Sequence, residues 1–411
     1  MDSGLQKNLV SIAQVSLLAI FSTYSFFFSR NIDSIGNSVL LAMSLICLVT
    51  LSFVKSDLCF ARSSLRYISV FFFLCILTII LPIWPNTENN WTYSAACKCI
   101  LGLSIVLIFK IQGSNWVKRT TWIIFLSLCV LMILQNTGFN IKEILNTLLF
   151  NCAVGAWNEK HHTFWLVILF WSSMYFIKDS SQYNKFITIL FFLFALFSSY
   201  SESAKVAIIF SIIVFLLSKS RPVVSWAIVY WALLLYILLF PFVLQILPIV
   251  DLDSAYDRLY IRFLLWEVAS NVIVDELMFG RGFGSTLSLN IIPFLPEFES
   301  SAREWLYMSK TFPGSHPHNF VALIWIEFGL IGALMLTFFL YKFNRFITKT
   351  IKHSDAAPYI ISIITTVVIL FSCSWSIWQT DVVLTYIMFL ASLYSLIISG
   401  NHKGKSFNAI E

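Results

Sequence analysis

Charged residues are scarce in this sequence, and that scarcity excludes an ordinary soluble domain. Of the 411 residues, 12% are Asp, Glu, Lys or Arg and 58% are hydrophobic. A water-exposed surface needs more charge than this, because soluble domains carry about a quarter charged residues. The chain also has no low-complexity tract and no internal repeat.

Motifs that would identify a metal or nucleotide site are also missing. The eight cysteines include no Cys-x-x-Cys and lie mostly within apolar runs, so they are interpreted as small core residues. The glycines between Gly280 and Gly284 do not form the dinucleotide-binding pattern and follow no predicted strand. His316 and His318 have no third metal ligand spaced nearby. We therefore expect no metal, no cofactor and no nucleic-acid partner.

Long apolar runs are abundant, and they predict an all-α, polytopic integral membrane protein. Forty phenylalanines and 14 tryptophans contribute to runs that short polar breaks separate. Runs of this length and composition cross a bilayer as helices. About twelve spans are predicted, at residues 9–29, 35–54, 67–83, 94–111, 121–137, 163–177, 186–200, 204–218, 223–249, 317–341, 358–377 and 381–399.

The positions of lysine and arginine predict the orientation of these spans. Alternate loops are rich in basic residues, and such loops lie in the cytoplasm. Both termini are then cytoplasmic, and residues 250–316, between the ninth and tenth spans, lie on the other side. We predict one membrane domain, residues 1–411, that carries this large loop. The basic loops contain Lys55, Arg62 and Arg66; Lys110, Lys118 and Arg119; Lys178 and Lys185; Lys219 and Arg221; and Lys342, Arg345, Lys349 and Lys352.

The large loop is predicted to begin with an amphipathic helix over 258–278. Its apolar side would comprise Leu259, Phe263, Trp266 and Val274. A helix of this kind lies on the membrane surface or caps the helix bundle.

Three arginines in the loop are candidate anion-binding residues. Arg258 and Arg262 are four residues apart and share a helix face, where two guanidinium groups grip either a diphosphate or lipid phosphates. Arg281 adds a third cation within the glycine-rich turn. The backbone N–H groups of that turn either approach an anion or cap the preceding helix.

Lys205 is a further candidate, because Ser201-Glu-Ser-Ala-Lys205 interrupts an apolar run at the predicted outer end of a helical hairpin. A Glu and a Lys in that position need partners or water. Either Lys205 projects to the same anion as the arginines, or it pairs with Glu202 at i, i+3. We favour the first interpretation.

The stretch 314–332 joins a polar, histidine-bearing segment to an apolar run that continues to Leu340. Pro317 suits the first position of a helix, so His318 and Asn319 are predicted in its first turn. The positive end of the helix dipole disfavours imidazolium, and a neutral imidazole accepts a proton at about pH 7. His318 is therefore either a general base at a membrane surface or part of an ordinary polar helix start.

Together these segments resemble the O-antigen ligase and polymerase superfamily. Residues 258–266, Arg-Leu-Tyr-Ile-Arg-Phe-Leu-Leu-Trp, are similar to the Arg-x-x-x-Trp helix of that family. Residues 277–284, Leu-Met-Phe-Gly-Arg-Gly-Phe-Gly, resemble its Pro-Leu-x-Gly-x-Gly turn, although Met and Phe depart from the usual wording. Residues 316–319, His-Pro-His-Asn, followed by Glu-x-Gly-x-x-Gly at 327–332, resemble the third motif. Lys205 lies near the place where the family often has Ser-Arg.

The resemblance implies a GT-C-like, inverting, metal-independent glycosyltransferase of the bacterial inner membrane. Its donor would be a glycan on undecaprenyl diphosphate, and the large loop would face the periplasm. His318 would take the proton of the acceptor hydroxyl. Arg262, with Arg258 and with Lys205 or Arg281, would stabilise the leaving diphosphate. The supporting residues would be His316, Asn319 and Trp266.

The acceptor distinguishes the alternative activities. An O-antigen ligase in lipopolysaccharide biosynthesis uses a sugar hydroxyl of lipid A–core, and this is the preferred assignment. A polymerase uses the end of another lipid-linked glycan instead. A flippase would move the same lipid without chemistry, but it needs polar groups at mid-membrane, often in broken helices. The sequence concentrates its polar groups at one face, which favours an enzyme.

Overall fold

The computed structural model of this chain confirms the predicted all-helical class, since every regular element among the described residues is a helix. The first four predicted spans lie outside the described residues, and the fifth and twelfth are described only in fragments. The described residues are 121–123, 125–126, 128–130, 132–133, 159–199, 201–246, 258–282, 284–295, 301–313, 316–374, 389–390, 392–393, 396–397 and 400.

The chain divides into two compact units, residues 1–201 with 380–395 and residues 202–379 with 396–411. In the described part of the first unit, α7 (Glu159–Phe176) packs against α8 (Gln182–Ser198). Their contact includes Phe170 and Phe192, whose rings stack with centroids 4.0 Å apart. Every residue proposed for the site belongs to the second unit.

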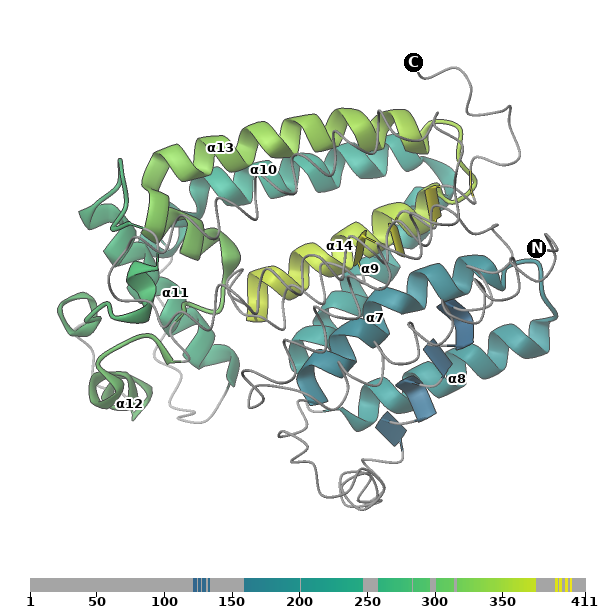
Figure 1. Ribbon diagram of the computed structural model, residues 1–411, viewed down its shortest axis with the longest axis horizontal. Helices are drawn as coiled ribbons and strands as arrows, with labels where there is room; N and C mark the ends of the chain where they lie inside the picture. Colours follow the sequence, from purple (N-terminus) through teal and green to yellow (C-terminus); the bar gives the residue numbers. More distant parts are fainter. Residues whose placement is uncertain are drawn as a thin grey trace, which may run out of the picture. The chain divides into compact units, whose positions relative to one another are not determined.

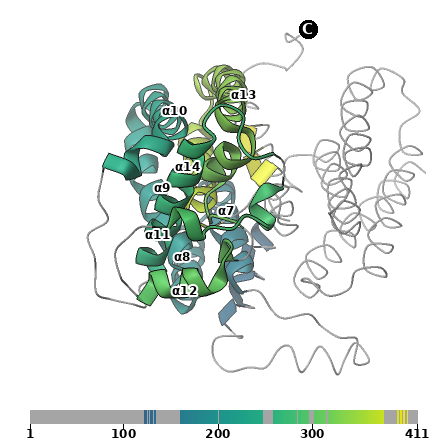
Figure 2. The same ribbon diagram turned by 90° about the vertical axis from the view of Figure 1, so that its left-hand side faces the viewer.

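The second unit is built from long helices with shorter elements beyond one end. Figure 1 shows α13 lying along α10 and α14 along α9, and Figure 2 views these helices from the end where α11 and α12 lie. The elements are α9 (Glu202–Ser220), α10 (Pro222–Ile246), α11 (Arg258–Asp275), the single turns η3 (Ser285–Leu287) and η4 (Ile292–Phe294), α12 (Ser301–Ser309), α13 (Phe320–Ile351) and α14 (Ala357–Ser374).

Three of the described helices are long and apolar enough to cross a membrane: Glu202–Ser220, Pro222–Val243 and Phe320–Ile351. The shorter apolar helix α14 packs against α9 and also contacts α10 and α13. Helix α9 packs against α14, and its buried residues include the small Ala204, Ala207 and Ser211, a residue type that allows helix backbones to approach closely. Large apolar side chains elsewhere on α9 are exposed, as expected for a surface that meets lipid.

Paired contacts show that the long helices run antiparallel. Near the start of α10, the indole N–H of Trp226 donates to Asn344 Oδ1 at 2.7 Å. Farther along the same helix, the carbonyl of Ile237 accepts from Trp325 Nε1 at 2.7 Å. Helix α13 therefore runs back along α10, so its first turn lies near the end of α10.

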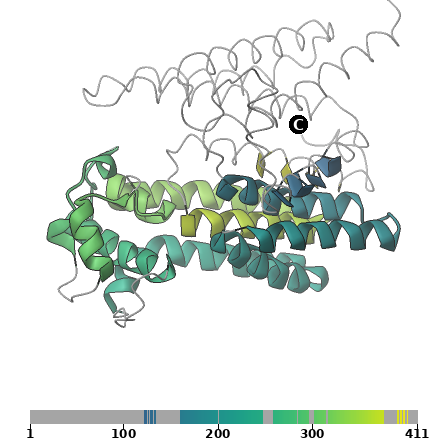
Figure 3. The same cartoon turned by 90° about the horizontal axis from the view of Figure 1, so that it is seen from below.

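A contact between side chains likewise shows that α9 and α14 run antiparallel. The rings of Phe215 and Tyr359 lie 4.9 Å apart, so the first turn of α9 is level with the last turn of α14. Phe320 lies 6.4 Å from Phe371 between ring centroids, which brings the start of α13 to that level as well. We call this level the site end, and Figure 3 shows α11 and α12 at the same end of the long helices.

The opposite end, which we call the basic end, carries six of the lysines and arginines of the second unit, all in short connections or near helix ends. It contains the α9–α10 junction, the last turns of α13 and the α13–α14 turn. The connections at this end belong to the basic short loops from which the sequence predicted a cytoplasmic side, and that orientation stays a prediction. The residues of the basic end are Lys219, Arg221, Lys342, Arg345, Lys349 and Lys352.

Helix α11 differs from its prediction in two respects. It ends at Asp275 rather than at residue 278, because a glycine turn follows. The predicted apolar side was wrong, since Phe263 and Val274 are exposed, whereas the side containing Leu264, Val268 and Val272 is buried. The buried side packs against α10 and α13, so α11 caps the bundle. Two side-chain hydrogen bonds hold α11 in place. The Ser270 hydroxyl donates to the carbonyl of Pro241, and the Asn271 side-chain amide donates to the carbonyl of Phe294.

Candidate functional site

The start of α13 is set by Asn319, which is its N-cap. The Asn319 side-chain oxygen accepts hydrogen bonds from the backbone N–H groups of Val321 at 2.9 Å and Ala322 at 3.2 Å. These N–H groups would otherwise have no partner within the helix. The prediction that Pro317 occupies the first helical position was therefore wrong. The helix begins at Phe320, and His318 lies just outside it.

His318 adopts a left-handed backbone conformation, with φ of 54°. For a residue other than glycine this costs about 1–2 kcal/mol, although histidine tolerates it better than most. The His318 backbone N–H donates to His316 Nδ1 at 3.0 Å, and the two rings lie 4.2 Å apart. His316 is buried and His318 half-buried. The buried ring thus holds the strained turn that presents His318.

Asn319 also joins three helices through a tyrosine that the sequence did not single out. Its side-chain N–H donates to the Tyr236 hydroxyl at 2.6 Å. That hydroxyl shares a second hydrogen bond with the Ser372 side chain on α14. Asn319 is fully buried, so these bonds satisfy polar groups that no water reaches. The start of α13 is therefore tied to α10 and α14 at the site end.

Arg262 reaches the same region from α11. It is half-buried and interacts electrostatically with Cys373, the neighbour of Ser372 on α14. The charge of Arg262 therefore acts on the end of α14, to which the Tyr236 hydroxyl also ties Asn319. Trp266 is one helical turn from Arg262 and packs edge-on against Phe263, with ring centroids 5.4 Å apart. Arg258 is the first residue of α11, and its side chain lies outside the described residues.

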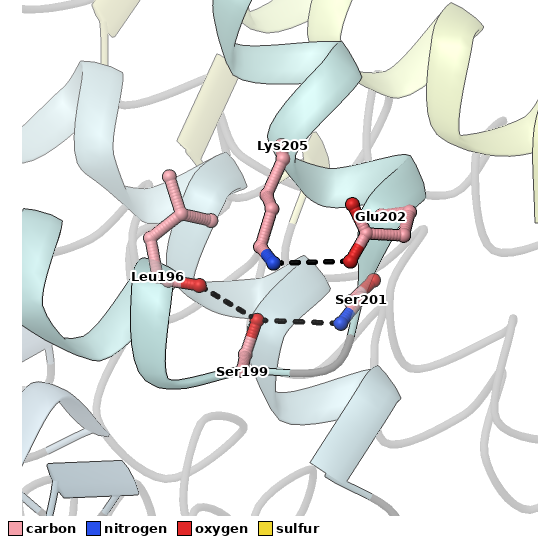
Figure 4. Close-up of polar contacts among 5 residues, drawn as sticks. All are labelled: Leu196, Ser199, Ser201, Glu202 and Lys205. Carbon is pink, nitrogen blue, oxygen red and sulfur yellow. Dashed lines mark hydrogen bonds and ion pairs between the residues drawn. The ribbon is translucent and has the colours of Figure 1, made fainter.

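Lys205 pairs with its neighbour on α9. Figure 4 shows its ammonium group directed at Glu202 Oε1, 3.0 Å away, which is the second of the two interpretations left open by the sequence. The close-up also shows the Ser199 hydroxyl donating to the Leu196 carbonyl and accepting from the Ser201 backbone N–H. Because Lys205 lies in the first turn of α9, it is at the site end. Its pairing with Glu202 is solvent-exposed, so exchange for a stronger anion would cost little.

Arg281 is held by acidic residues at the end of α11. Its guanidinium group lies 2.5 Å from Asp275 Oδ2 and 3.6 Å from Glu276 Oε1, and it stacks over the ring of Phe294. The turn around it caps α11, because the Gly280 N–H donates to the Glu276 carbonyl at 3.0 Å. Of the two predictions for this turn, helix capping is therefore the one that the structure shows.

Two carboxylates lie near these elements. Glu327, on α13, is buried and accepts a hydrogen bond from the Thr286 hydroxyl at 3.2 Å. Glu267, on α11, is half-buried, and burial raises the pKa of its carboxyl above the ordinary value of 4.5. One of its oxygens is enclosed without a hydrogen-bond partner among the described residues.

Tyr236, Ser372 and Cys373 are the site-end residues that sequence reasoning missed. Each lies within a long apolar run, where a single hydroxyl or thiol gives no periodic signal. The sequence offered one indication of a polar site near Ser372 and Cys373. The segment Phe-Ser-Cys-Ser at 371–374 is polar and lies near the end of a predicted span. Only the packing of α10, α13 and α14 against one another brings these groups together.

Comparison with known proteins identifies relatives of this chain. Residues 187–337 match the family model described as O-antigen ligase, a range that contains α9 to α12 and the start of α13. A curated protein of Rickettsia typhi, strain Wilmington, which carries the provisional name polysaccharide ligase, is 26% identical over 245 residues. A protein of Rickettsia prowazekii, strain Madrid E, with the same provisional name, is 26% identical over 243 residues. The chain spans about half of each relative, since the alignments cover 57% of this chain and 56% of those proteins.

The tie between Asn319 and Tyr236 is tested by Tyr236→Phe, which removes only the hydroxyl. The buried Asn319 amide would lose its acceptor, so we expect the free energy of unfolding to fall by about 1–3 kcal/mol. Thermal unfolding of the protein in lipid nanodiscs measures this. Tyr230→Phe on the same helix is the matched control. Equal midpoints for the two variants would show that the hydroxyl of Tyr236 does not hold the start of α13.

The buried environment of Glu267 predicts a pH-dependent stability. Since its pKa is raised in the folded state, the protonated form is favoured there, and the associated stability is lost as the pH rises above the ordinary value of 4.5. Glu267→Gln imitates the protonated acid. We therefore expect this variant to unfold at a higher temperature than wild type at neutral pH, with the difference vanishing in acid. A constant difference across the pH range would contradict the assignment.

Proposed function

We propose that this chain, which belongs to the O-antigen ligase superfamily, transfers a glycan from undecaprenyl diphosphate to a sugar hydroxyl of lipid A–core. The family match and the provisionally named polysaccharide ligases support a glycan-transferring role. The observation that carries the proposal is that Arg262 acts electrostatically on Cys373 near the end of α14, to which the Asn319 cap is also tied through Tyr236 and Ser372. A cation and an imidazole at one end of a membrane bundle suit a lipid-linked diphosphate donor.

The proposed reaction is an inverting displacement at the anomeric carbon of the donor sugar. His318 accepts the proton of the acceptor hydroxyl as its oxygen forms the new glycosidic bond. The bond between the anomeric carbon and the diphosphate oxygen breaks at the same time, and undecaprenyl diphosphate leaves. Arg262 stabilises the negative charge that grows on that diphosphate, so the reaction needs no metal.

The remaining predicted residues take supporting roles. Arg258 adds a second guanidinium to the diphosphate site, and Lys205 contributes its charge after exchanging Glu202 for the donor. Arg281 acts through the electrostatic field of the site while it remains paired with Asp275. Asn319 and His316 hold the turn that bears His318.

The proposed orientation of the chain rests on its short loops. The short connections and helix ends opposite the site carry six lysines and arginines, and basic short loops mark the cytoplasmic side of a membrane protein, whereas charges in long loops count for little. We accordingly place the site at the periplasmic face of the inner membrane, where the lipid A–core acceptor is also found. The bulky apolar side chains exposed on α9, α10 and α13 would contact lipid.

The broken helix α13 is the feature that a transporter would also use, but its geometry favours an enzyme. Transporters leave unwound carbonyls free to coordinate an ion or substrate at mid-membrane. In this chain the carbonyls of Ile326 and Glu327, next to the break at Gly329, accept hydrogen bonds from Arg281 and Gly282. The break is filled by protein, so it offers no transport site.

Purified protein reconstituted with undecaprenyl-diphosphate glycan and lipid A–core, in the presence of EDTA, tests the proposal. We expect His318→Ala to lower the rate of transfer by about 10²–10⁴-fold, because the base is lost. Arg262→Ala should lower it by about 10²–10³-fold, because charge on the leaving diphosphate is no longer stabilised. Gel separation of the lipid A–core products measures the rate.

His353→Ala and Arg345→Ala are the matched controls, since they remove the same side chains at the basic end. Both should retain transfer at the wild-type rate. Full activity of His318→Ala would remove the proposed base. Longer lipid-linked glycans with no attachment to lipid A–core would identify a polymerase, and movement of the lipid across the membrane without transfer would identify a flippase.

A further inference from the structure

Helix α13 is broken at Gly329, and the turn that follows α11 fills the break. Gly329 has φ of 58° and ψ of −149°, a conformation that essentially only glycine adopts. Gly280, at the end of α11, also has a positive φ, of 66°. The two glycines meet backbone to backbone, far apart in sequence but in direct contact.

The contact leaves no room for a side chain on either residue. A Cβ atom at Gly280 would lie 2.6 Å from the backbone nitrogen of Gly329 and 2.7 Å from the carbonyl oxygen of Ile326. A Cβ atom at Gly329 would lie 2.6 Å from the nitrogen of Gly280 and equally close to the carbonyl of Met278. Because the obstructing atoms belong to the backbone, neither segment can yield by moving a side chain.

Three backbone hydrogen bonds join the turn to the broken helix. The N–H groups of Arg281 and Gly282 donate to the carbonyls of Ile326 and Glu327, at 2.7 and 3.0 Å. In return, the N–H of Leu330 donates to the carbonyl of Leu277 at 2.8 Å. We call this arrangement, the Gly280–Gly329 contact with its three hydrogen bonds, the interlock.

The interlock is joined directly to the two segments that carry the proposed site. On the α11 side, Arg281 pairs with Asp275 and Glu276, which ties the turn to the last turn of the helix that bears Arg262. On the α13 side, the residues before Gly329 form a short helical segment that begins at the Asn319 cap. Helix α11 also packs along α13, so a shift at the interlock would be transmitted to both.

We propose that the interlock is a positioning device that sets the separation between Arg262 and His318. This inference rests on the proposed function, in which one residue holds the leaving diphosphate and the other takes the acceptor proton. Both groups must engage the same donor sugar, so their spacing governs the chemical step more than it governs donor binding. Loosening the interlock would leave each segment folded but displaced relative to the other.

Gly280→Ala and Gly282→Ala form a matched pair of variants for this test. Both positions have a positive φ, of 66° and 94°, so alanine strains the backbone at each. Only at Gly280 does the new methyl group meet the backbone of α13, because nothing lies within 4 Å of a Cβ atom at Gly282. Any difference between the variants therefore reports the interlock rather than turn strain.

The readout is the division of the effect between kcat and KM for the lipid-linked donor, measured on folded, reconstituted protein well below its unfolding temperature. Gly280→Ala should lower kcat by about 10²-fold with KM changed by less than about threefold, as expected for misplaced reacting groups. Gly282→Ala should keep kcat within about threefold of wild type. Wild-type kcat in Gly280→Ala, with only a lower unfolding temperature, would reduce the interlock to a structural role and overturn the proposal.

A second variant and a measurement on wild type cover the case in which Gly280→Ala does not fold. Leu330 is the first residue after the break, a position like the start of a helix that proline tolerates, and proline there removes one hydrogen bond of the interlock. Leu330→Pro should show the same selective loss of kcat. In wild type, the amides of Arg281, Gly282 and Leu330 should exchange hydrogen as slowly as those of α13, and exchange at the rate of an open loop would overturn the interlock.

These outcomes separate the inference from the function on which it rests. Absence of transfer by wild type would contradict the proposed function, whereas slow amide exchange would still support the interlock as a feature of the fold. Transfer by wild type together with an unchanged kcat in both Gly280→Ala and Leu330→Pro would contradict the inference alone.

Discussion

The structure depends on one constraint, which is that backbone N–H and C=O groups inside a membrane must find partners within the protein. Helix α13 meets this constraint along most of its length but fails at two points. At its start, the Asn319 side chain accepts from buried N–H groups that have no partner within the helix. At its break, the turn after α11 supplies N–H groups to the carbonyls of Ile326 and Glu327. Each of these two sets of hydrogen bonds involves a different part of the chain, and together they hold the elements of the site end in contact.

The Asn319 cap and the filled break explain why the polar groups of this region lie close together. Capping by Asn319 leaves its amide N–H to be satisfied, and Tyr236 of α10 and Ser372 of α14 complete that network. Filling the break draws α11 against α13 and so carries Arg262 toward the same level. The strained conformation of His318 follows from the step between the buried His316 and the cap. In this account the candidate site is a consequence of how the backbone of α13 is satisfied.

The sequence predicted the parts of this structure that depend on local pattern. Long apolar runs indicated α9, α10, α13 and α14, because a span of that length and composition has few alternatives to a helix. The spacing of Arg258 and Arg262 correctly indicated a shared helix, α11. The alternation of basic loops indicated that residues 219–221 and 342–352 would lie at the same end of the helices, as they do. The predicted single membrane domain, the full number of spans and the periplasmic loop stay predictions.

Features set by contacts between distant segments were not predictable in this way. Pro317 resembled a helix start, but an Asn cap two residues later decided where α13 begins. The buried side of α11 was wrongly predicted, because its apolar residues surround the helix and only the packing against α10 and α13 selects a side. Nothing in a Gly-x-x-Gly spacing reveals that Gly329 breaks the helix. Tyr236 was missed for the same reason, since its role depends on meeting Asn319 across the bundle.

The most direct test of the central claim is an electron cryomicroscopy structure of the protein in a lipid nanodisc with undecaprenyl-diphosphate glycan bound. The account predicts the diphosphate within hydrogen-bonding distance of Arg262 at the site end, with the first sugar facing His318. A diphosphate bound among Lys342 and Lys349 at the basic end, or one that leaves Arg262 without contact, would contradict it.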